Sequence, residues 1–411
     1  MRNPVRRSDT RRVPSEKDGV PAEIWVLVAA GFVIALGFGL VSPALPQYAV
    51  SFGVGATAAS AVISAFALLR LLSAPMSGRM VQRLGERPVY LTGLAVVAVS
   101  TGACALAQTF WQLLLFRSLG GVGSAMFIVS ALGLIIRISP PGSRGRISGI
   151  YATSFLLGSV SGPLVGAALV GFGLRVPFAI YAVALVIAAA VVYFRLRNSV
   201  LATPESGRQA AAMTFREGFG FPAYRAAMLS NFADGWAVFG VRMALVPLFV
   251  VEVLHHDSAT AGIALTVFAV GNALVLSAAG RLSDRMGRKP FLIVGTAVCG
   301  VATIAMGLTS SLPLFFVAVA VAGLGSGMIN PAQQAAVADI IGSRARGGPV
   351  LAAFQMSADV GTVVGPTVAG ALAQHFSYGV AFGVAGAVLL VATVGWSVVG
   401  ETLGGAGVGG K

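Results

Sequence analysis

The chain contains few charged residues, few cysteines and few histidines. Charged residues make up 10% of its 411 residues, whereas soluble domains have about 25%. A soluble protein of this length needs more charge to cover its surface, so a soluble fold is excluded. Two cysteines, Cys104 and Cys299, and three histidines provide neither a disulfide framework nor metal-ligand spacing. We therefore expect no metal site.

The sequence also lacks the patterns of enzymes and of nucleic-acid-binding proteins. Its net charge is +14, but the basic residues are dispersed among apolar stretches and form no aromatic-rich polar face. There is no Ser/His/Asp constellation and no Walker-type lysine loop. We therefore expect no enzyme, no ATP-driven step, no cofactor and no nucleic-acid partner.

Long apolar segments dominate the chain. Hydrophobic residues make up 56% of it and glycine occurs 53 times, as is typical of closely packed membrane helices. A membrane helix needs about 20 mainly apolar residues, and twelve segments meet this length. They are 24–49, 57–77, 89–108, 112–136, 147–171, 176–195, 225–254, 259–280, 289–309, 312–341, 349–373 and 377–399.

A basic, glycine-bounded turn occurs twice in the sequence. Residues 78–88 recur 202 positions later as residues 280–290, each time between two apolar stretches. We therefore predict an all-α polytopic membrane protein, with twelve transmembrane helices in two pseudo-symmetric six-helix halves. The predicted regions are an N-terminal tail (1–22), the first half (23–196), a linker (197–224), the second half (225–400) and a C-terminal tail (401–411).

The basic residues predict the orientation in the membrane, because cytoplasmic loops collect Lys and Arg. With the N-terminus inside, 24 of the 28 basic residues lie on the inner side and only Arg175 lies outside. The chain is thus expected in the inner (cell) membrane, with both termini cytoplasmic and the basic turns near anionic lipid headgroups. His255 and His256 fall in an outer turn and supply too few ligands for a metal.

Further motifs repeat between the halves. Residues 121–126 (GVGSAM) match 323–328 (GLGSGM). Gly158 and Gly162-Pro163 of segment 147–171 align with Gly361 and Gly365-Pro366 of 349–373, whereas Gly149 and Gly166 align with alanines. Together with Phe116-Arg117-Ser118-Leu119-Gly120 and the doubled turn, these motifs resemble the major facilitator superfamily over nearly the whole chain. The glycine pattern of segment 147–171 resembles the "antiporter" motif of the drug/proton antiporter branch.

The resemblance implies two halves that rock around a binding site near the middle of the membrane. It assigns a gating role to the doubled turn, with Gly78, Arg79, Arg83, Gly85, Gly280, Asp284, Arg285, Gly287 and Arg288. It assigns the antiporter motif to Gly149, Gly158, Gly162, Pro163 and Gly166. We expect Gly158, Gly162 and Pro163 to bend the segment and to remove bulk where the halves meet; ordinary packing of small residues is the alternative. One residue departs from the family pattern, since Gln82 replaces the usual Asp of the first turn. A turn that only orients the chain remains the alternative.

Ionisable residues inside membrane segments are costly and usually face a cavity or a partner. Arg117, Asp234 and Arg242 lie on spans that, by the resemblance, line the central cavity. Asp234 lies in an aromatic-flanked stretch and is a candidate for proton coupling; a structural ion pair is the alternative. Asp234 and Arg242 are eight residues apart, about 12 Å along a helix, which is too far for a direct pair.

Arg70 and Asp359 suggest a second role. By the resemblance, their spans pack together where the halves meet, and both residues lie at a similar depth. The repeat maps them onto Asn272 and Leu156, so both charges are absent from the equivalent interface. We predict an ion pair that closes the inner side when the protein faces outward. In the competing interpretation, Asp359 carries the proton and Arg70 modulates it.

The predicted function is secondary active transport, with the proton gradient as energy source. We expect efflux of small lipophilic or amphipathic compounds by a monomer. Arg117, Trp236, Phe239, Arg242 and Asn330 are the expected cavity residues, and Asp234 and Asp359 the proton-coupling candidates. The alternative is a proton-coupled symporter or a facilitator of a polar metabolite, for which the cavity should be rich in hydrogen-bonding side chains.

Overall fold

The computed structural model describes residues 22–138, 144–197, 213–341 and 348–403, and over these ranges it contains helices and no strand. The first half comprises α1 (Ala22–Val41), α2 (Ala44–Val50), α3 (Ala56–Leu84), α4 (Glu86–Ala105), α5 (Phe110–Ile138), α6 (Arg144–Val170) and α7 (Val176–Leu196). The short α8 (Phe215–Phe219) precedes the second half. That half comprises α9 (Pro222–Asp234), the π-helix η2 (Gly235–Val241), α10 (Arg242–Glu252), α11 (Ser258–Met286), α12 (Arg288–Leu308), α13 (Leu312–Ile341), α14 (Gly348–His375) and α15 (Tyr378–Ser397).

These helices account for the twelve predicted spans. Eleven helical segments of the described chain are long and apolar enough to cross a membrane. The remaining predicted span corresponds to α14, which has the necessary length but contains polar residues such as Gln355 and Asp359. The first span is broken at Ser42 and Pro43 into α1 and α2. The seventh is one continuous rod whose middle seven residues are π-helical.

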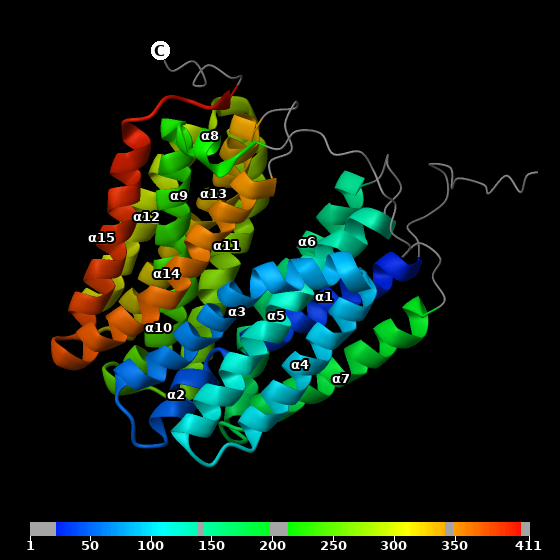
Figure 1. Cartoon of the computed structure of the whole chain (residues 1–411). Coiled ribbons are helices and arrows are strands. Elements are labelled where there is room, and N and C mark those ends of the chain that lie inside the picture. The colour runs from blue at the N-terminus through cyan, green and yellow to red at the C-terminus, as the bar shows by residue number, and fades with distance from the viewer. Residues whose placement is uncertain (1–21, 139–143, 198–212, 342–347, 404–411) are drawn as a thin grey trace, which may run out of the picture.

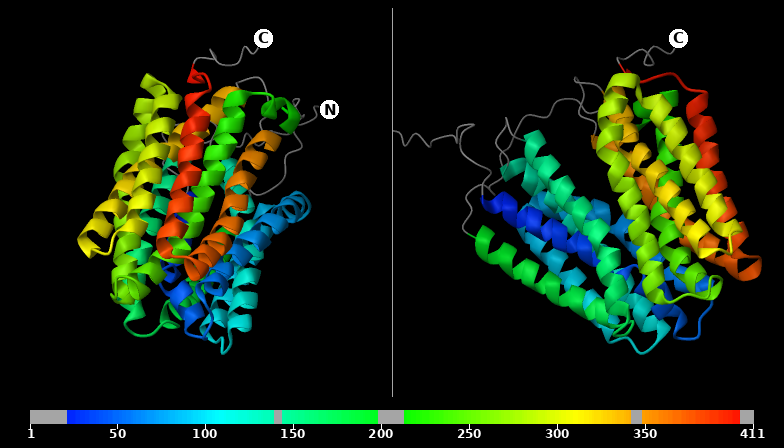
Figure 2. Two further views of the ribbon diagram at one scale, coloured as in Figure 1. Left: turned by 90° about the vertical axis from the view of Figure 1, so that its left-hand side faces the viewer. Right: turned by 180° about the vertical axis from the view of Figure 1, so that it is seen from behind.

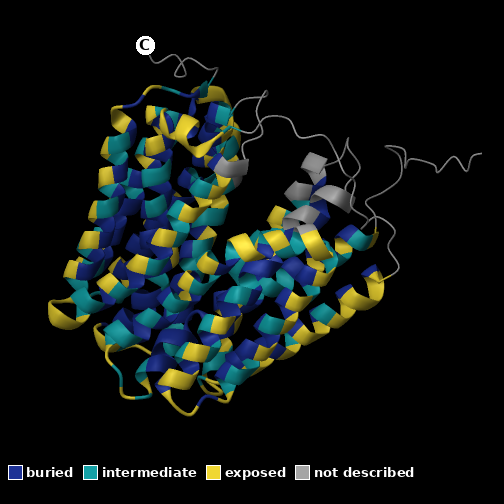
Figure 3. Cartoon of the chain, viewed as in Figure 1, coloured by how far each residue is buried: buried dark blue, intermediate teal, exposed yellow. Residues whose placement is uncertain are grey.

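The spans form two bundles that diverge toward the end of the molecule where the C-terminus lies (Figure 1). We call this end the open end. Seen from behind, α1–α7 and α9–α15 form two bundles that meet at the opposite, closed end (Figure 2). Exposed residues run along the outward faces of the helices and buried ones lie between them (Figure 3). Many exposed residues are large and apolar, for example Leu72, Val99 and Phe172, as a lipid-facing surface requires.

The glycines of the antiporter motif pack α6 against α1 of the same half. A methyl group at Gly158, Gly162 or Gly166 would collide with the backbone of α1, at Phe32, Leu36 and Leu40 respectively. The expectation that Gly158 and Gly162 lie where the halves meet is therefore wrong, and the alternative of close helix packing within one half describes them. The three glycines line one face of α6, and the close approach of α1 explains why these positions have no side chain. Gly149 lies in α6 as well.

The adjoining face of α6, one residue further along from each glycine, makes the contact between the halves. There Gly262 of α11 lies so close that a Cβ on it would be 2.8 Å from the carbonyl oxygen of Pro163 and 2.6 Å from Cβ of Ala167. Pro163 and Ala167 of the motif, rather than its glycines, thus face the second half.

The doubled turn is much shorter than its sequence pattern indicates. Helix α3 continues through Gly78 and Arg79 to Leu84, and α11 continues through Gly280 to Met286. A single glycine then reverses the chain in each copy, with φ of 85° at Gly85 and 102° at Gly287. These positive φ values are easily reached by glycine alone, and in each motif only the second glycine adopts one.

The predicted tails and linker fall mostly outside the described residues. The predicted N-terminal tail precedes α1, which already includes Ala22. Of the predicted linker 197–224, the structure describes Arg197 and residues 213–224. This stretch includes α8, whose first turn is closed by a capping box between Thr214 and Glu217. The last three residues of the predicted linker already belong to α9.

Candidate transport cavity and proton-coupling site

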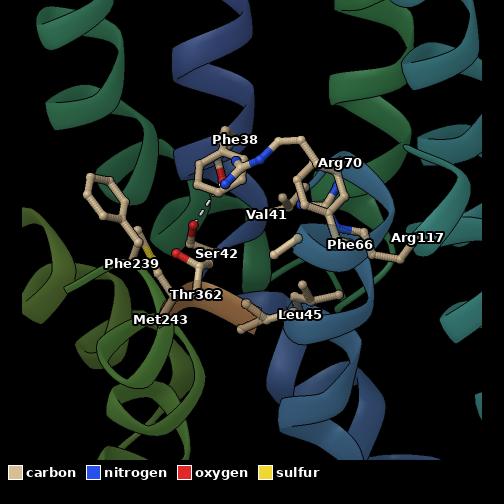
Figure 4. A pocket seen from close by; sticks show the side chains of 12 residues that line it. Phe38, Val41, Ser42, Leu45, Phe66, Arg70, Arg117, Phe239, Met243 and Thr362 are labelled. Carbon is tan, nitrogen blue, oxygen red and sulfur yellow. Dashed lines mark hydrogen bonds between the residues drawn. The ribbon is translucent and has the colours of Figure 1, made fainter. Parts of the chain in front are cut away.

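A cavity of about 1750 Å³, continuous with solvent, lies between the two halves. Its walls come from most spans of the first half and from η2, α10, α11 and α13 of the second. It narrows into a pocket of about 550 Å³ lined from both halves. In that pocket Arg70 and Arg117 enter from one side, and Phe239 and Met243 face them from the other (Figure 4).

Hydrogen bonds across the halves keep the closed end together. Gln47 of α2 contacts the Ser258 hydroxyl at the start of α11. The side-chain oxygen of Gln374 accepts the backbone N–H of Thr57, at 3.2 Å. Farther from this end, Thr367 donates from its hydroxyl to that of Ser64, at 2.9 Å. The cavity is therefore shut at the closed end and accessible from the open end.

A third polar contact joins α3 and α14 across the halves, an ion pair between Arg70 and Asp359. The side chains of both residues are 24% exposed, so neither charge is fully buried; Arg70 lines the cavity and Asp359 does not. The structure brings these residues together as the sequence predicts, but it does so while the open end is accessible. If the open end is the cytoplasmic side, the pair is thus not confined to the outward-facing state for which it was predicted. Its gating role remains a prediction.

The other two membrane arginines stack on aromatic rings that line the cavity. The Arg117 guanidinium carbon lies 4.3 Å from the centre of the Phe66 ring, and that of Arg242 lies 3.6 Å from the centre of the Phe268 ring. Nε of Arg242 also donates to the carbonyl of Val238, at 3.0 Å. In the described part of the chain, neither arginine forms a salt bridge. Stacking on a ring face therefore takes the place of a carboxylate partner.

Asp234 lies at the junction of α9 and the π-helix and is only 1% exposed. One carboxylate oxygen, Oδ2, accepts a hydrogen bond of 3.4 Å from the side-chain amide of Asn330. The other, Oδ1, has no hydrogen-bond partner among the described residues. Asp234 itself does not line the cavity, but Asn330 does. The carboxylate is thus one side chain away from the cavity, next to a segment whose geometry often marks functional sites.

Trp236 is not a cavity residue, contrary to the prediction. It is 8% exposed, and its ring packs 5.8 Å from that of Phe232 inside the second half. Phe239, three positions later, is 44% exposed and lines the cavity. The sequence places both aromatics on one span but does not show which side of it faces the cavity.

A polar network behind Asp234 was missed at the level of sequence. Gln333 of α13 donates to the side-chain oxygen of Asn231 and accepts from the hydroxyl of Ser230, both at 3.0 Å. Asn231 donates onward to the backbone carbonyl of Phe354, at 2.6 Å. All three network residues are buried. Uncharged side chains hardly alter hydropathy. The available signal was Ser and Asn beside a membrane aspartate on the seventh span, together with Asn330 and Gln333 on the tenth.

Asp284 of the second basic turn is held in an ion-pair cluster at the open end. Arg288 pairs with Asp284 and, at 3.2 Å, with Asp339 of α13. The carboxylate of Glu401 accepts the backbone N–H groups of Arg288 and Lys289, at 2.9 and 3.1 Å. Burial raises the pKa of Glu401, but these N–H groups and those of Thr402 and Leu403 outweigh it, and the net pKa is lowered. The basic residues Arg79, Arg83 and Arg285 of the predicted motif are exposed.

The sequence matches the Major Facilitator Superfamily over residues 27–229 and again over residues 227–403. The chain belongs to this family. It is therefore a multi-pass membrane transporter of a small molecule, as the sequence predicts, and not an enzyme. The two adjacent matches cover most of the chain and correspond to its two halves.

Individual relatives agree with this family. The multidrug efflux protein YfmO of Bacillus subtilis is 26% identical over 90% of this chain and 91% of its own length. The quinolone resistance protein NorA of Staphylococcus aureus is 31% identical over 38% of this chain and 40% of its own length. A bacterial homologue of the human lysosomal transporter Spinster, solved in an inward-facing, unoccupied conformation, superposes with a TM-score of 0.75. It is 18% identical, with 92% of this chain and 94% of that one covered, and it shows the same fold.

Proposed function

We propose that the protein exports small lipophilic or amphipathic compounds in exchange for protons, by alternating access between the two halves. The observation that carries the proposal is the arrangement of Asp234, Asn330 and the cavity. A buried carboxylate with one unpartnered oxygen lies behind a single amide side chain on the wall of a large apolar cavity. A charge in such surroundings is costly, and taking up a proton removes that cost.

The proton is expected to change the wall of the cavity through Asn330. An ionised Asp234 only accepts hydrogen bonds, whereas a protonated carboxyl can also donate one. The Asn330 amide, which now donates to Asp234, would then present a different hydrogen-bonding group to the compound in the cavity. Proton and compound would thereby compete through one side chain, as exchange requires.

Efflux is favoured by the lining of the cavity and by the relatives. The lining is predominantly apolar, with Phe38, Phe127, Phe155 and Phe239 among its side chains. YfmO is named a multidrug efflux protein and NorA a quinolone resistance protein. The alternative of a symporter or facilitator for a polar metabolite would require more hydrogen-bonding groups than the few present, such as Asn272, Ser326 and Gln334.

The test is transport by purified protein in liposomes, with and without a pH gradient. Wild type should move a lipophilic dye against its concentration gradient only when the pH gradient is present. Asp234→Asn should abolish this response. Asp257→Asn is the matched control, because Asp257 caps α11 by accepting from Thr260 in an exposed turn, and asparagine caps helices equally well.

Three outcomes would contradict the proposal in whole or in part. Transport by Asp234→Asn that still follows the pH gradient would remove Asp234 from coupling. If instead Asp359→Asn alone abolished the response, the proton carrier would be the Arg70-paired carboxylate. Wild-type transport that ignores the pH gradient would refute proton coupling altogether.

A further inference from the structure

The charged side chains that line the cavity are all positive. In the described part of the chain, Arg70, Arg117 and Arg242 reach its surface, and no aspartate, glutamate or lysine does. Arg70 is neutralised by Asp359. Arg117 and Arg242 have no such partner, so a water-accessible, largely apolar cavity contains two positive charges that are not paired with an acid.

We propose that the transported compound is an organic anion with an apolar body, whose acidic group binds to Arg117 and Arg242. This deepens the proposed export function by assigning a charge to its substrate. An arginine inside a membrane is costly unless it finds a partner, and a carboxylate or sulfonate of the compound would supply one. Planar acid groups suit guanidinium particularly well, because two parallel N–H donors match two oxygens.

The stacking on Phe66 and Phe268 fixes how each guanidinium can bind. A ring covers one face of the guanidinium and leaves the N–H groups at its edge directed sideways. Nε of Arg242 is used by Val238, so its terminal nitrogens are the donors that remain. Nε of Arg117 is buried and has no hydrogen-bond partner among the described residues. Arg242 thus offers its terminal nitrogens to a ligand, and Arg117, which is only 4% exposed, has an unsatisfied donor in the wall of the cavity.

The internal repeat supports a functional origin for this pair. Phe66 and Phe268 occupy equivalent positions, 202 residues apart, and one arginine stacks on each ring. The arginines themselves are not equivalent. Arg117 corresponds to Val319, and Arg242, at the 204-residue offset of its span, corresponds to Phe38. The same stacked arrangement therefore arises from two different helices, α5 and α10, which simple duplication does not explain.

The acid nearest in sequence to Arg242 lies outside the lining of the cavity. Asp234 is two helical turns earlier, and Asn330 contacts it from the cavity wall. It forms no salt bridge with Arg242 among the described residues. The apolar remainder of the cavity, including Phe38 and Phe239, would surround the body of the compound.

The test is binding to the full chain in detergent without any gradient, so that its result does not depend on proton coupling. The probes are 1-anilinonaphthalene-8-sulfonate and N-phenyl-1-naphthylamine, which share the same rings but differ in the sulfonate. Arg117→Gln and Arg242→Gln should each weaken binding of the sulfonate about tenfold, and change binding of the neutral amine less than about twofold. Arg216→Gln, in the exposed helix α8, is the matched control and should change neither.

The neutral probe also reports whether each variant is folded. Equal losses for both probes, or no loss for either, would overturn the proposal. Wild type offers a second test that needs no variant. Decanoate should displace the bound sulfonate at about tenfold lower concentration than decyltrimethylammonium, which has the same chain length. The opposite order would show a preference for cations and refute the assignment, while leaving proton-driven export untouched.

Discussion

The two halves share a framework but differ in what they bury at equivalent positions. Behind the cavity, the second half has a polar network of Ser230, Asn231 and Gln333 next to Asp234 and Asn330. At the equivalent positions of the first half the sequence has Val26, Leu27, Ala131, Ala30 and Ile128. Of these, Leu27, Ala30 and Ala131 are buried in hydrocarbon packing. The carboxylate and its polar surroundings thus belong to one half only.

This difference indicates a division of labour within a duplicated fold. Helix packing needs small residues, and both halves have them, at Gly158 in the first and Gly361 in the second. Proton exchange needs a buried acid with polar neighbours, and one copy is enough. The first half then contributes mainly apolar side chains to the wall of the cavity, together with Arg70 and Arg117.

The largest effect is expected when residues of the first half are placed at the equivalent positions of the second half. Gln333→Ala removes the partner of both Ser230 and Asn231 and opens a cavity, so it should cost about 3 kcal/mol of stability. The melting temperature of the purified protein in detergent measures this loss.

The compensating variant is Ser230→Val/Asn231→Leu/Gln333→Ala, which copies the first half at all three positions. Replacing all partners by apolar groups removes the unsatisfied donors, so more than half of the lost stability should return. The proposed proton-driven transport should be impaired in both variants, because Asn330 loses its contact with Gln333. A triple variant less stable than Gln333→Ala would show that the network does not act as a unit.

A smaller effect is expected at the interfaces between the halves. Asp359→Asn leaves the charge of Arg70 without its partner and should cost about 2 kcal/mol, less than for a fully buried pair because both side chains are partly exposed. Arg70→Asn/Asp359→Leu reproduces the equivalent pair Asn272 and Leu156 and should recover to within about 1 kcal/mol of wild type. Melting temperatures of the three proteins test this; a double variant that melts below the single one would contradict it.

The smallest effect concerns the turn that Glu401 tethers. Because the folded-state pKa of Glu401 is lowered, its contribution to stability is present above the unfolded pKa of about 4.3 and is lost as pH falls through the folded value. Glu401→Gln should therefore lower the melting temperature at neutral pH, and the difference from wild type should vanish in acid. A difference that is the same at pH 7 and pH 3 would exclude the carboxylate charge as its cause.

Much of this architecture could be predicted from the sequence. Membrane spans follow from the length of apolar runs, and the two halves follow from the repeated turn. A charged residue in such a run is conspicuous, so Arg70, Asp234 and Asp359 could be selected directly. The pairing of Arg70 with Asp359 could also be predicted, because their charges are absent together at the equivalent interface.

What could not be predicted depends on which way a helix faces. Trp236 and Phe239 lie on one span, but only Phe239 lines the cavity, and the π-helical stretch between Asp234 and Arg242 has no clear marker in the sequence. The stacking of Arg117 on Phe66 joins residues from two helices, which no local pattern reports. The antiporter glycines were placed on the wrong face of α6 for the same reason.

The positions of the two thiols make the protein convenient for spectroscopic labelling. Cys104 and Cys299, one in each half, are 0% and 1% exposed. Water-soluble maleimides should therefore react with a cysteine introduced on the surface and not with Cys104 or Cys299. Arg83 and Arg285, exposed at the open end of either half, are equivalent in the repeat. Spin labels attached there would report how far the bundles separate, without any native cysteine having to be removed.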